Sequence, residues 1–374
     1  MAGIYIHIPF CKQACSYCNF HFSTTAKHRE EIVAAMLKEI EHRADFFNGE
    51  AIKSIYLGGG TPSILNQAEL SSIFKQLESH FNLNDLKEVT LEANPDDLSK
   101  EKLRELKELP INRLSIGIQS FHQKDLDFMN RAHSAEEGIA TVKRALDMGF
   151  EKLSLDLIFG IPTSTTADWE ANLRQIFSLD FDHLSAYALT LEEGTLFHHQ
   201  VKSGKAKEIE DREVAEQYNL LQDYIKNESW EQYELSNYCR NEQYAIHNTA
   251  YWMNEKYLGI GPAAHSYDGA KRRWNLANNH LYYKHIHEGK QYYETEQLSE
   301  IDRYHELLIS RLRTKWGIPK TFLEETFSSN ILEHFTNKLS KLSEYFEEKD
   351  DRYQIKRAFW FTSDNLLEQL MVDS

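Results

Sequence analysis

The chain has 374 residues, a length that favours one large domain with a smaller one attached. Its formal net charge of −16 argues against a general role in nucleic-acid binding, because phosphate backbones are bound by basic surfaces. We find no apolar run of about 18 residues and no cationic leader before an apolar core, so the sequence predicts neither a membrane span nor a secretory signal.

Six β-rich runs follow one another along the first half of the chain. Each is rich in Ile, Leu, Val or Tyr, and most end in Gly, Asn or Pro, as strands that lead into turns do. The sequence predicts strands at residues 3–10, 53–59, 88–94, 113–119, 152–160 and 183–190.

Amphipathic runs separate these strands. In the first of them, Ile32, Met36, Ile40 and Ala44 recur at helical spacing, which predicts one apolar face. Ser99 is expected to cap the third helix. The predicted helices span residues 29–47, 68–81, 98–108, 135–148, 166–177 and 211–228.

Six β/α units in a row predict an α/β fold with a parallel sheet and right-handed crossovers. Six is fewer than the eight units of a closed barrel, so we expect a partial, TIM-like (β/α)6 barrel. Polar residues and glycines stand near the ends of the predicted strands, where the active site of such a barrel is found. They are Gly58–Gly60, Glu92, Gln119, Asp156 and Thr190.

The composition changes after the barrel, which suggests three parts. We expect the core barrel at residues 1–230, a Tyr-, Trp- and His-rich segment that caps it at 231–298, and a small, mainly helical domain at 299–374. The last part has helical runs at 302–314, 321–327 and 330–342 and a β-like run at 352–362. A winged helix is one arrangement that fits this order.

Three cysteines, Cys11, Cys15 and Cys18, are crowded into eight residues after the first strand. Three thiolates at this spacing can bind three irons of a [4Fe–4S] cluster. The alternatives are a zinc site, for which His7 and His21 are poorly placed as further ligands, or three unrelated buried thiols. Either metal reading requires a reducing compartment, and the cytoplasm is the default. The remote Cys239 is expected to be a free buried thiol.

The C-x₃-C-x₂-C spacing with Tyr17 inside it resembles the radical-SAM signature, in which the fourth iron binds S-adenosylmethionine (SAM). The wider set of motifs resembles oxygen-independent coproporphyrinogen III oxidases and the related HemW-type heme chaperones. The motifs occur in the same order as in these proteins and cover nearly the whole chain. They are YIHIPFC (5–11), GGGTPS (58–63), LEANP (91–95), SIGIQS (115–120), NR (130–131) and DLIFGIP (156–162).

This resemblance implies a SAM pocket and assigns residues to it. Arg131 would hold the carboxylate of SAM, Glu92 its ammonium group, and Gln119 and Asp156 its ribose hydroxyls. Glycine would let the backbone approach the methionine part, and an adenine could stack on an aromatic ring. The remaining residues expected at the cofactor are Tyr5, Tyr17, Gly59, Gly60, Thr61 and His265.

Two features separate the chain from the oxidases. The oxidases carry a fourth cysteine two residues after the third, where this chain has Phe20 as the HemW-type chaperones do. The oxidases also have an arm before the first strand, whereas here Tyr5 stands close to the first residue. Both differences favour the chaperones.

A further motif, H-N-x-x-Y-W, is characteristic of the HemW-type proteins and begins at His247. His247 could bind heme iron while Tyr251 and Trp252 pack on the porphyrin. The alternative is that these residues build the wall of the barrel mouth, with a buried and hydrogen-bonded histidine.

Two hypotheses therefore remain. The first is a radical-SAM heme chaperone with a [4Fe–4S] cluster and SAM as cofactors and heme as cargo. Its partners would be heme-accepting proteins, membrane proteins among them, and an electron donor such as flavodoxin or ferredoxin. The second is an enzyme, an oxygen-independent coproporphyrinogen III oxidase or another porphyrin-modifying enzyme. Phe20 makes the oxidase activity doubtful, and no residue is assigned as catalytic.

Overall fold

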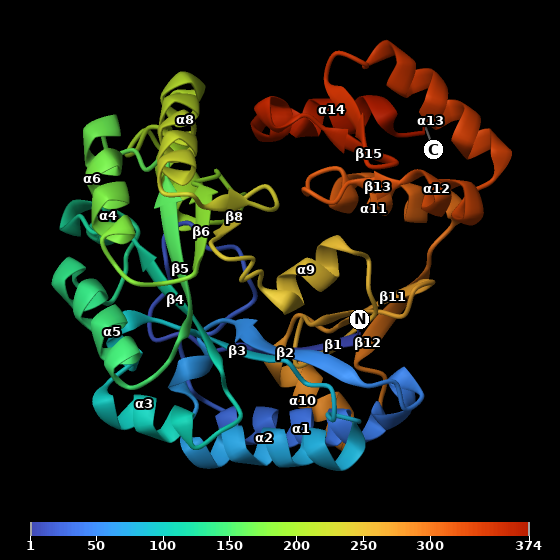
Figure 1. Cartoon of the computed structure of the whole chain (residues 1–374). Coiled ribbons are helices and arrows are strands. Elements are labelled where there is room, and N and C mark those ends of the chain that lie inside the picture. Colours follow the sequence, from blue (N-terminus) through green and yellow to red (C-terminus); the bar gives the residue numbers. More distant parts are fainter. Residues whose placement is uncertain (1, 373–374) are drawn as a thin grey trace.

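A twelve-stranded sheet forms the centre of the computed structural model, which describes residues 2–372 (Figure 1). Its six middle strands are parallel and stand in chain order. The first and last of them do not pair, so the barrel is open, as the predicted (β/α)6 fold requires. These strands are β1 (Ala2–Ile8), β2 (Ile52–Gly59), β3 (Glu88–Ala93), β4 (Arg113–Gln119), β5 (Lys152–Phe159) and β6 (His183–Ala188).

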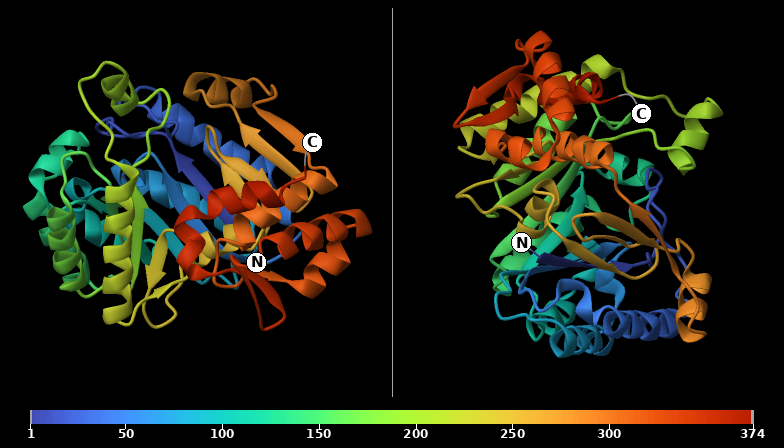
Figure 2. Two further views of the ribbon diagram at one scale, coloured as in Figure 1. Left: turned by 90° about the horizontal axis from the view of Figure 1, so that it is seen from above. Right: turned by 90° about the vertical axis from the view of Figure 1, so that its right-hand side faces the viewer.

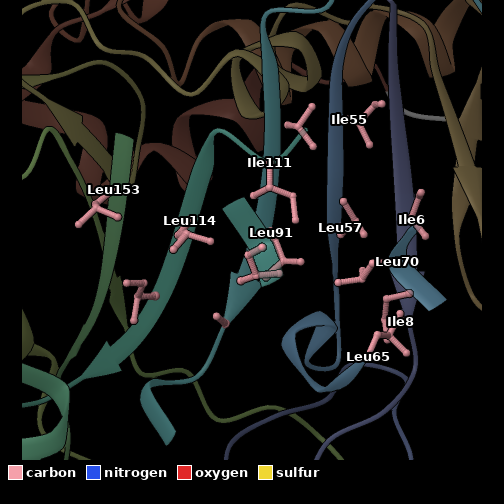
Figure 3. Packing of buried hydrophobic residues seen from close by; sticks show 14 of the residues in the cluster. Ile6, Ile8, Ile55, Leu57, Leu65, Leu70, Leu91, Ile111, Leu114 and Leu153 are labelled. Carbon is pink, nitrogen blue, oxygen red and sulfur yellow. The ribbon is translucent and has the colours of Figure 1, made fainter. Parts of the chain in front are cut away.

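Six helices cover the outer face of these strands, close to the predicted ranges. Between sheet and helices lies an apolar core in which Ile55, Leu57 and Leu91 are fully buried (Figure 3), each contributing roughly 1.5–3 kcal/mol. Ser99 caps its helix as predicted, accepting a hydrogen bond from the Lys102 amide. The helices are α1 (Arg29–His42), α2 (Gln67–His80), α3 (Lys100–Lys107), α5 (Ala135–Asp147), α6 (Thr166–Phe177) and α8 (Asp211–Asn227).

Two further helices, α4 (Gln123–Phe128) and α7 (Leu196–Lys202), were not predicted. With six and seven residues they are too short to show apolar periodicity. Both lie in loops at the carboxyl ends of the strands, where the site is expected. No helix within residues 2–372 has the length and apolar character needed to cross a membrane.

The segment after α8 widens the sheet at both edges. On the β6 side it supplies two short antiparallel strands, and on the β1 side it supplies β9, parallel to β1, followed by an antiparallel extension. These strands are β7 (Glu231–Gln232), β8 (Asn237–Cys239), β9 (Tyr257–Ile260), β10 (His265–Tyr267), β11 (Lys271–Asn275) and β12 (Tyr293–Gln297). Helix α10 (Asn279–His287) packs beside α1.

Helix α9 (Ile246–Trp252) covers the amino ends of the strands, opposite the cysteine loop. Glu88, the first residue of β3, accepts hydrogen bonds from the amides of Ile246 and His247, both at 2.9 Å. The alternative to heme contact placed a buried and hydrogen-bonded His247 in the wall of the barrel mouth. His247 is buried and hydrogen-bonded, but it lies at the amino ends of the strands. Sequence spacing alone does not show at which end of a barrel a distant helix docks.

The last part of the chain has its own hydrophobic core, which includes Tyr304, Phe335 and Trp360. A three-stranded antiparallel sheet packs there against four helices, and only the first four residues of the predicted β-like run form a strand. The elements are α11 (Glu300–Arg311), β13 (Ile318–Pro319), α12 (Lys320–Thr326), α13 (Ser329–Lys341), β14 (Phe346–Lys349), β15 (Arg352–Ile355) and α14 (Ser363–Leu370).

Candidate cofactor site

The three cysteines lie on the loop after β1, at the carboxyl ends of the barrel strands. All three are half-buried free thiols. The Cys11 amide donates to the Ser23 carbonyl (3.0 Å), and the Cys18 amide to the Cys15 carbonyl (3.3 Å), so the loop closes on itself. Burial raises the pKa of Cys11 to about 11 and also raises the pKa of Cys18.

The glycine turn, residues Gly58–Gly60, holds this loop from one side. The Gly60 amide donates to the Ile8 carbonyl (2.8 Å), and the Thr61 amide donates to the Phe10 carbonyl (2.7 Å). A Cβ on Gly60 would stand 2.5 Å from the Phe10 carbonyl oxygen. Glycine is thus required at this position because two protein backbones meet, in addition to the expected approach of the cofactor.

A second set of contacts holds the loop from the side of α4. The Ser16 amide donates to the Met129 carbonyl, and its hydroxyl donates to the Phe128 carbonyl, both at 3.0 Å. Asn130 donates to the Ala14 carbonyl at 2.7 Å. The cysteine loop is therefore fixed to its neighbours before any metal is considered.

Arg131 joins the loop to the ends of β3 and β4. Its Nη1 donates to Cys15 Sγ (3.2 Å), and its Nη2 donates to Asn94 Oδ1 (2.6 Å) and the Gly117 carbonyl (3.0 Å). Its Nε is buried and has no hydrogen-bond partner within the described residues. A buried N–H without a partner is costly, so this position suits a bound carboxylate oxygen.

Glu92 and Tyr56 form a pair inside the barrel, where the Tyr56 hydroxyl donates to Glu92 Oε1 at 2.6 Å. Burial raises the pKa of Glu92. The Tyr56 ring stacks on that of Tyr5, whose hydroxyl lies 3.1 Å from His7 Nδ1. A half-buried carboxylate of this kind suits a cationic group of a ligand.

Asp156 projects into the barrel from β5, where the Ser115 hydroxyl lies 3.3 Å from its carboxylate oxygens. Burial, reinforced by the charge of Glu92, raises the pKa of Asp156 to about 7. Gln119 ends β4 at a register shift with a φ of 66°, and its amide nitrogen lies over Gly117. Both side chains thus stand at the same end of the barrel as the cysteines.

Tyr17 and His265 are carried by two different segments, the loop after β1 and strand β10. Tyr17 packs on a small apolar cluster built around Leu126 and Met129. His265 is exposed at the start of β10, and its ring stacks on Trp274 at a centroid distance of 6.2 Å. Every residue predicted at the cofactor therefore lies on β1–β5, β10 or the loops that follow them.

The residues predicted for heme lie on α9, where the His247 ring stacks on the ring of Tyr56, the partner of Glu92, at a centroid distance of 5.2 Å. His247 is 2% exposed, and its ring nitrogens face Ser54 Oγ (2.9 Å) and the Tyr251 hydroxyl (3.2 Å). Burial lowers the pKa of His247 to about 3, so the ring is neutral. Tyr251 and Trp252 are half-buried. In this arrangement His247 has no nitrogen free for iron.

The donor set fits a cubane cluster better than a single ion. A structural zinc ion takes four protein ligands, whereas the loop offers three thiolates. A cubane places each thiolate on a different iron, which three cysteines on one curved loop can satisfy.

Asn94 belongs to the motif LEANP (91–95), but the sequence predicts no role for its side chain in the site. Its amide nitrogen donates to Thr61 Oγ1 (3.2 Å), and its oxygen accepts from Arg131, so it links the turn to the guanidinium. Its position directly after β3, two residues after Glu92, indicates that it lies at the same end of the barrel as the site. Tyr56 lies within β2 and gave no comparable signal.

Gly60→Ala should reduce cluster assembly. The new methyl group would overlap the Phe10 carbonyl oxygen, and relieving such an overlap costs about 1–3 kcal/mol, enough to lower cluster occupancy several-fold. Iron and sulfide per chain after anaerobic reconstitution measure this. Gly138→Ala on α5 is the control, because its methyl group would meet only ordinary contacts at 3.6 Å or more. Full iron content in Gly60→Ala would show that the turn does not position the loop.

Comparison with known proteins agrees with this geometry. The radical SAM superfamily profile matches residues 5–176, and the HemN C-terminal domain profile matches residues 298–353. Coproporphyrinogen III oxidase (HemN) from Escherichia coli has a similar fold, with a TM-score of 0.82 over 99% of this chain and 89% of that one. The two sequences are 23% identical, so this similarity concerns the fold alone.

Relatives with higher sequence identity show to which family within this superfamily the chain belongs. The heme chaperone HemW of Bacillus subtilis is 33% identical over 347 residues, which cover 92% of each chain. The heme chaperone HemW of Mycobacterium tuberculosis is 32% identical over 284 residues, 75% of this chain and 73% of the relative. The chain therefore belongs to the radical-SAM superfamily and, within it, to the HemW family.

Proposed function

We propose that the protein is a radical-SAM heme chaperone, which binds a [4Fe–4S] cluster, SAM and heme and delivers the heme to acceptor proteins. The observation that carries this proposal is the 33% identity to a heme chaperone over 92% of both chains. Phe20, in the place of the fourth cysteine of the oxidases, supports the same choice.

In this proposal Cys11, Cys15 and Cys18 hold three irons and leave the fourth iron for SAM. The bound, reduced cluster supplies an electron that can break the sulfonium bond. The chain itself fixes the loop through Ser16 and Gly60 and shields Cys11 by burial. Its share of the chemistry is therefore to position the reactants and limit solvent access.

The SAM-binding residues act through charge and hydrogen bonds. Arg131 Nε donates to the carboxylate, and Glu92 accepts from the ammonium group. Asp156 and Gln119 bind the ribose hydroxyls, and Tyr17 packs on the adenine. The backbone of residues 59–61 borders the methionine part, and Tyr5 and His265 complete the walls.

Heme contact by His247, Tyr251 and Trp252 is part of the proposal, and it requires a change at α9. His247 must first leave Ser54 or the Tyr251 hydroxyl, because both of its ring nitrogens face these groups. The two contacts are worth about 1 kcal/mol each, which iron ligation can offset.

A coproporphyrinogen III oxidase is the second candidate, favoured by the similarity of fold to HemN. It needs a substrate site that functions without the fourth cysteine of that enzyme group. In this chain the corresponding residue is Phe20, whose side chain is 68% exposed and cannot bind a metal.

The remaining parts of the proposal follow from the cofactors. A reduced cluster needs an electron donor, for which flavodoxin or ferredoxin is suitable, and a reducing compartment such as the cytoplasm.

Residues 1–230 form the cofactor-binding part, 231–298 complete the barrel, and 299–374 form a separate domain with an element order like that of a winged helix. The separate hydrophobic core around Tyr304 supports this last division.

Heme binding and turnover distinguish the two functions. Anaerobically reconstituted protein should bind heme and pass it to an apo-hemoprotein, yet convert no coproporphyrinogen III when SAM and a reductant are present. Absorption spectra follow the heme, and chromatography of the porphyrins follows turnover. Formation of protoporphyrinogen IX by the wild-type protein would contradict the chaperone function.

SAM affinity should depend on pH through Asp156. The ribose hydroxyls donate to the carboxylate, and the pKa of Asp156 is raised to about 7, so deprotonation is complete only above that value. Below pH 7 the affinity should fall, by at most about tenfold per pH unit, because the protonated carboxyl accepts fewer hydrogen bonds. Equilibrium binding between pH 6 and 9, compared with Asp156→Asn, measures this. An identical pH profile for wild type and Asp156→Asn would show that Asp156 does not bind SAM.

A further inference from the structure

A line of contacts runs through the interior of the barrel from α9 to the cofactor site. The His247 ring stacks on the ring of Tyr56, with the two centroids 5.2 Å apart and an angle of 25° between the planes. The Tyr56 hydroxyl donates to Glu92 Oε1 at 2.6 Å. Tyr56 therefore contacts both the histidine expected to bind heme iron and the carboxylate expected to bind SAM.

Helix α9 encloses His247 at the bottom of the barrel. It contacts β1 and β2 on one side and α11 of the C-terminal domain on the other, as the right-hand view of Figure 2 shows. The His247 ring is 2% exposed, and a Cβ on Gly3 would stand 3.1 Å from its Nδ1. Iron can therefore reach the ring only after the ring has left its place on Tyr56.

The pair of Tyr56 and Glu92 is fixed at its other end by the glycine turn. A Cβ on Gly58 would stand 2.8 Å from the Tyr56 ring and 2.9 Å from Glu92 Oε1, so both side chains pack against this backbone. Burial raises the pKa of Glu92, and an ammonium group beside it favours the ionised form. A hydrogen bond from a tyrosine to an ionised carboxylate is roughly twice as strong as one to a neutral carboxyl. A cation bound at Glu92 therefore holds Tyr56 more firmly.

We propose that Tyr56 couples the two sites, so that SAM binding weakens the binding of heme by His247. With SAM bound, Glu92 holds Tyr56 in the position in which its ring stacks on His247, and the histidine stays buried. With heme bound, His247 has left the Tyr56 ring, and the contact that steadies the tyrosine is lost. The inference rests on the proposed function and adds to it a means of release, because SAM binding favours transfer of the heme to the acceptor.

The coupling is measured as the ratio of the heme dissociation constants with and without SAM. The protein carries the oxidised cluster, so that SAM is bound but not cleaved, and the heme absorption band follows binding. In the wild type, saturating SAM should weaken heme binding about tenfold. Saturating heme should weaken the binding of radiolabelled SAM by the same factor, because the coupling between two sites is reciprocal.

Tyr56→Phe separates the coupling from the packing. The variant keeps the ring that stacks on His247 and loses only the hydroxyl that donates to Glu92. Its heme affinity without SAM should stay within about twofold of the wild type, whereas SAM should change that affinity by about twofold or less. A purely structural role of Tyr56 would instead shift the heme affinities with and without SAM together and leave their ratio unchanged.

Tyr282→Phe is the matched control. The Tyr282 hydroxyl also donates to a buried glutamate at 2.6 Å, but its acceptor is Glu39 Oε2, and the pair lies between α10 and α1. The same chemical change at this pair should leave the wild-type ratio of heme affinities in place.

The results that refute the coupling differ from those that refute the function. SAM that leaves the heme affinity of the wild type unchanged, or raises it, contradicts the coupling although both ligands bind. A wild-type ratio in Tyr56→Phe, or a lost ratio in Tyr282→Phe, shows that the link does not depend on the Tyr56 hydroxyl. A wild-type protein that binds no heme, or no SAM, refutes the proposed function itself.

Discussion

The close approach of two backbones, at the glycine turn after β2 and the loop after β1, is the constraint on which the site depends. The amides of Gly60 and Thr61 donate to the carbonyls of Ile8 and Phe10, and a Cβ on Gly60 would prevent this. Because the loop is fixed at that point, Arg131 can reach Cys15 and Asn94 can reach Thr61. The cysteine loop, the glycine turn and the ends of β3 and β4 thus form one hydrogen-bonded unit.

Much of the barrel could be predicted from the sequence because each strand and helix is recognisable from its own short stretch of residues. Each of the six strands is a short apolar run that ends near a turn residue, and each main helix has one apolar face. Once the strands are parallel, their carboxyl ends must meet, which brings Glu92 and Asp156 together near the cysteines. Glu92, Gln119 and Asp156 were expected at the strand ends for the same reason, whereas their assignment to SAM followed from the family resemblance.

What the sequence did not reveal depends on contacts between distant segments. β9 pairs with β1 across more than two hundred residues, and two- to five-residue strands have no recognisable pattern of their own. The position of α9 is set by Glu88 and Ser54, far away in the chain. The sequence therefore does not show that His247 lies at the amino ends of the strands and not in the wall of the barrel mouth. Helix α7 was missed because it is short.

In the proposed function, the three cysteines on the hydrogen-bonded loop after β1 leave one iron of the cluster for SAM. Electron–nuclear double resonance of the reduced cluster, with SAM labelled with ¹⁵N at its amino group, tests this assignment. We expect a nitrogen coupling that appears on addition of labelled SAM and is absent without it. A reduced cluster whose spectrum does not change with SAM would contradict the assignment, because the fourth iron would then have another ligand.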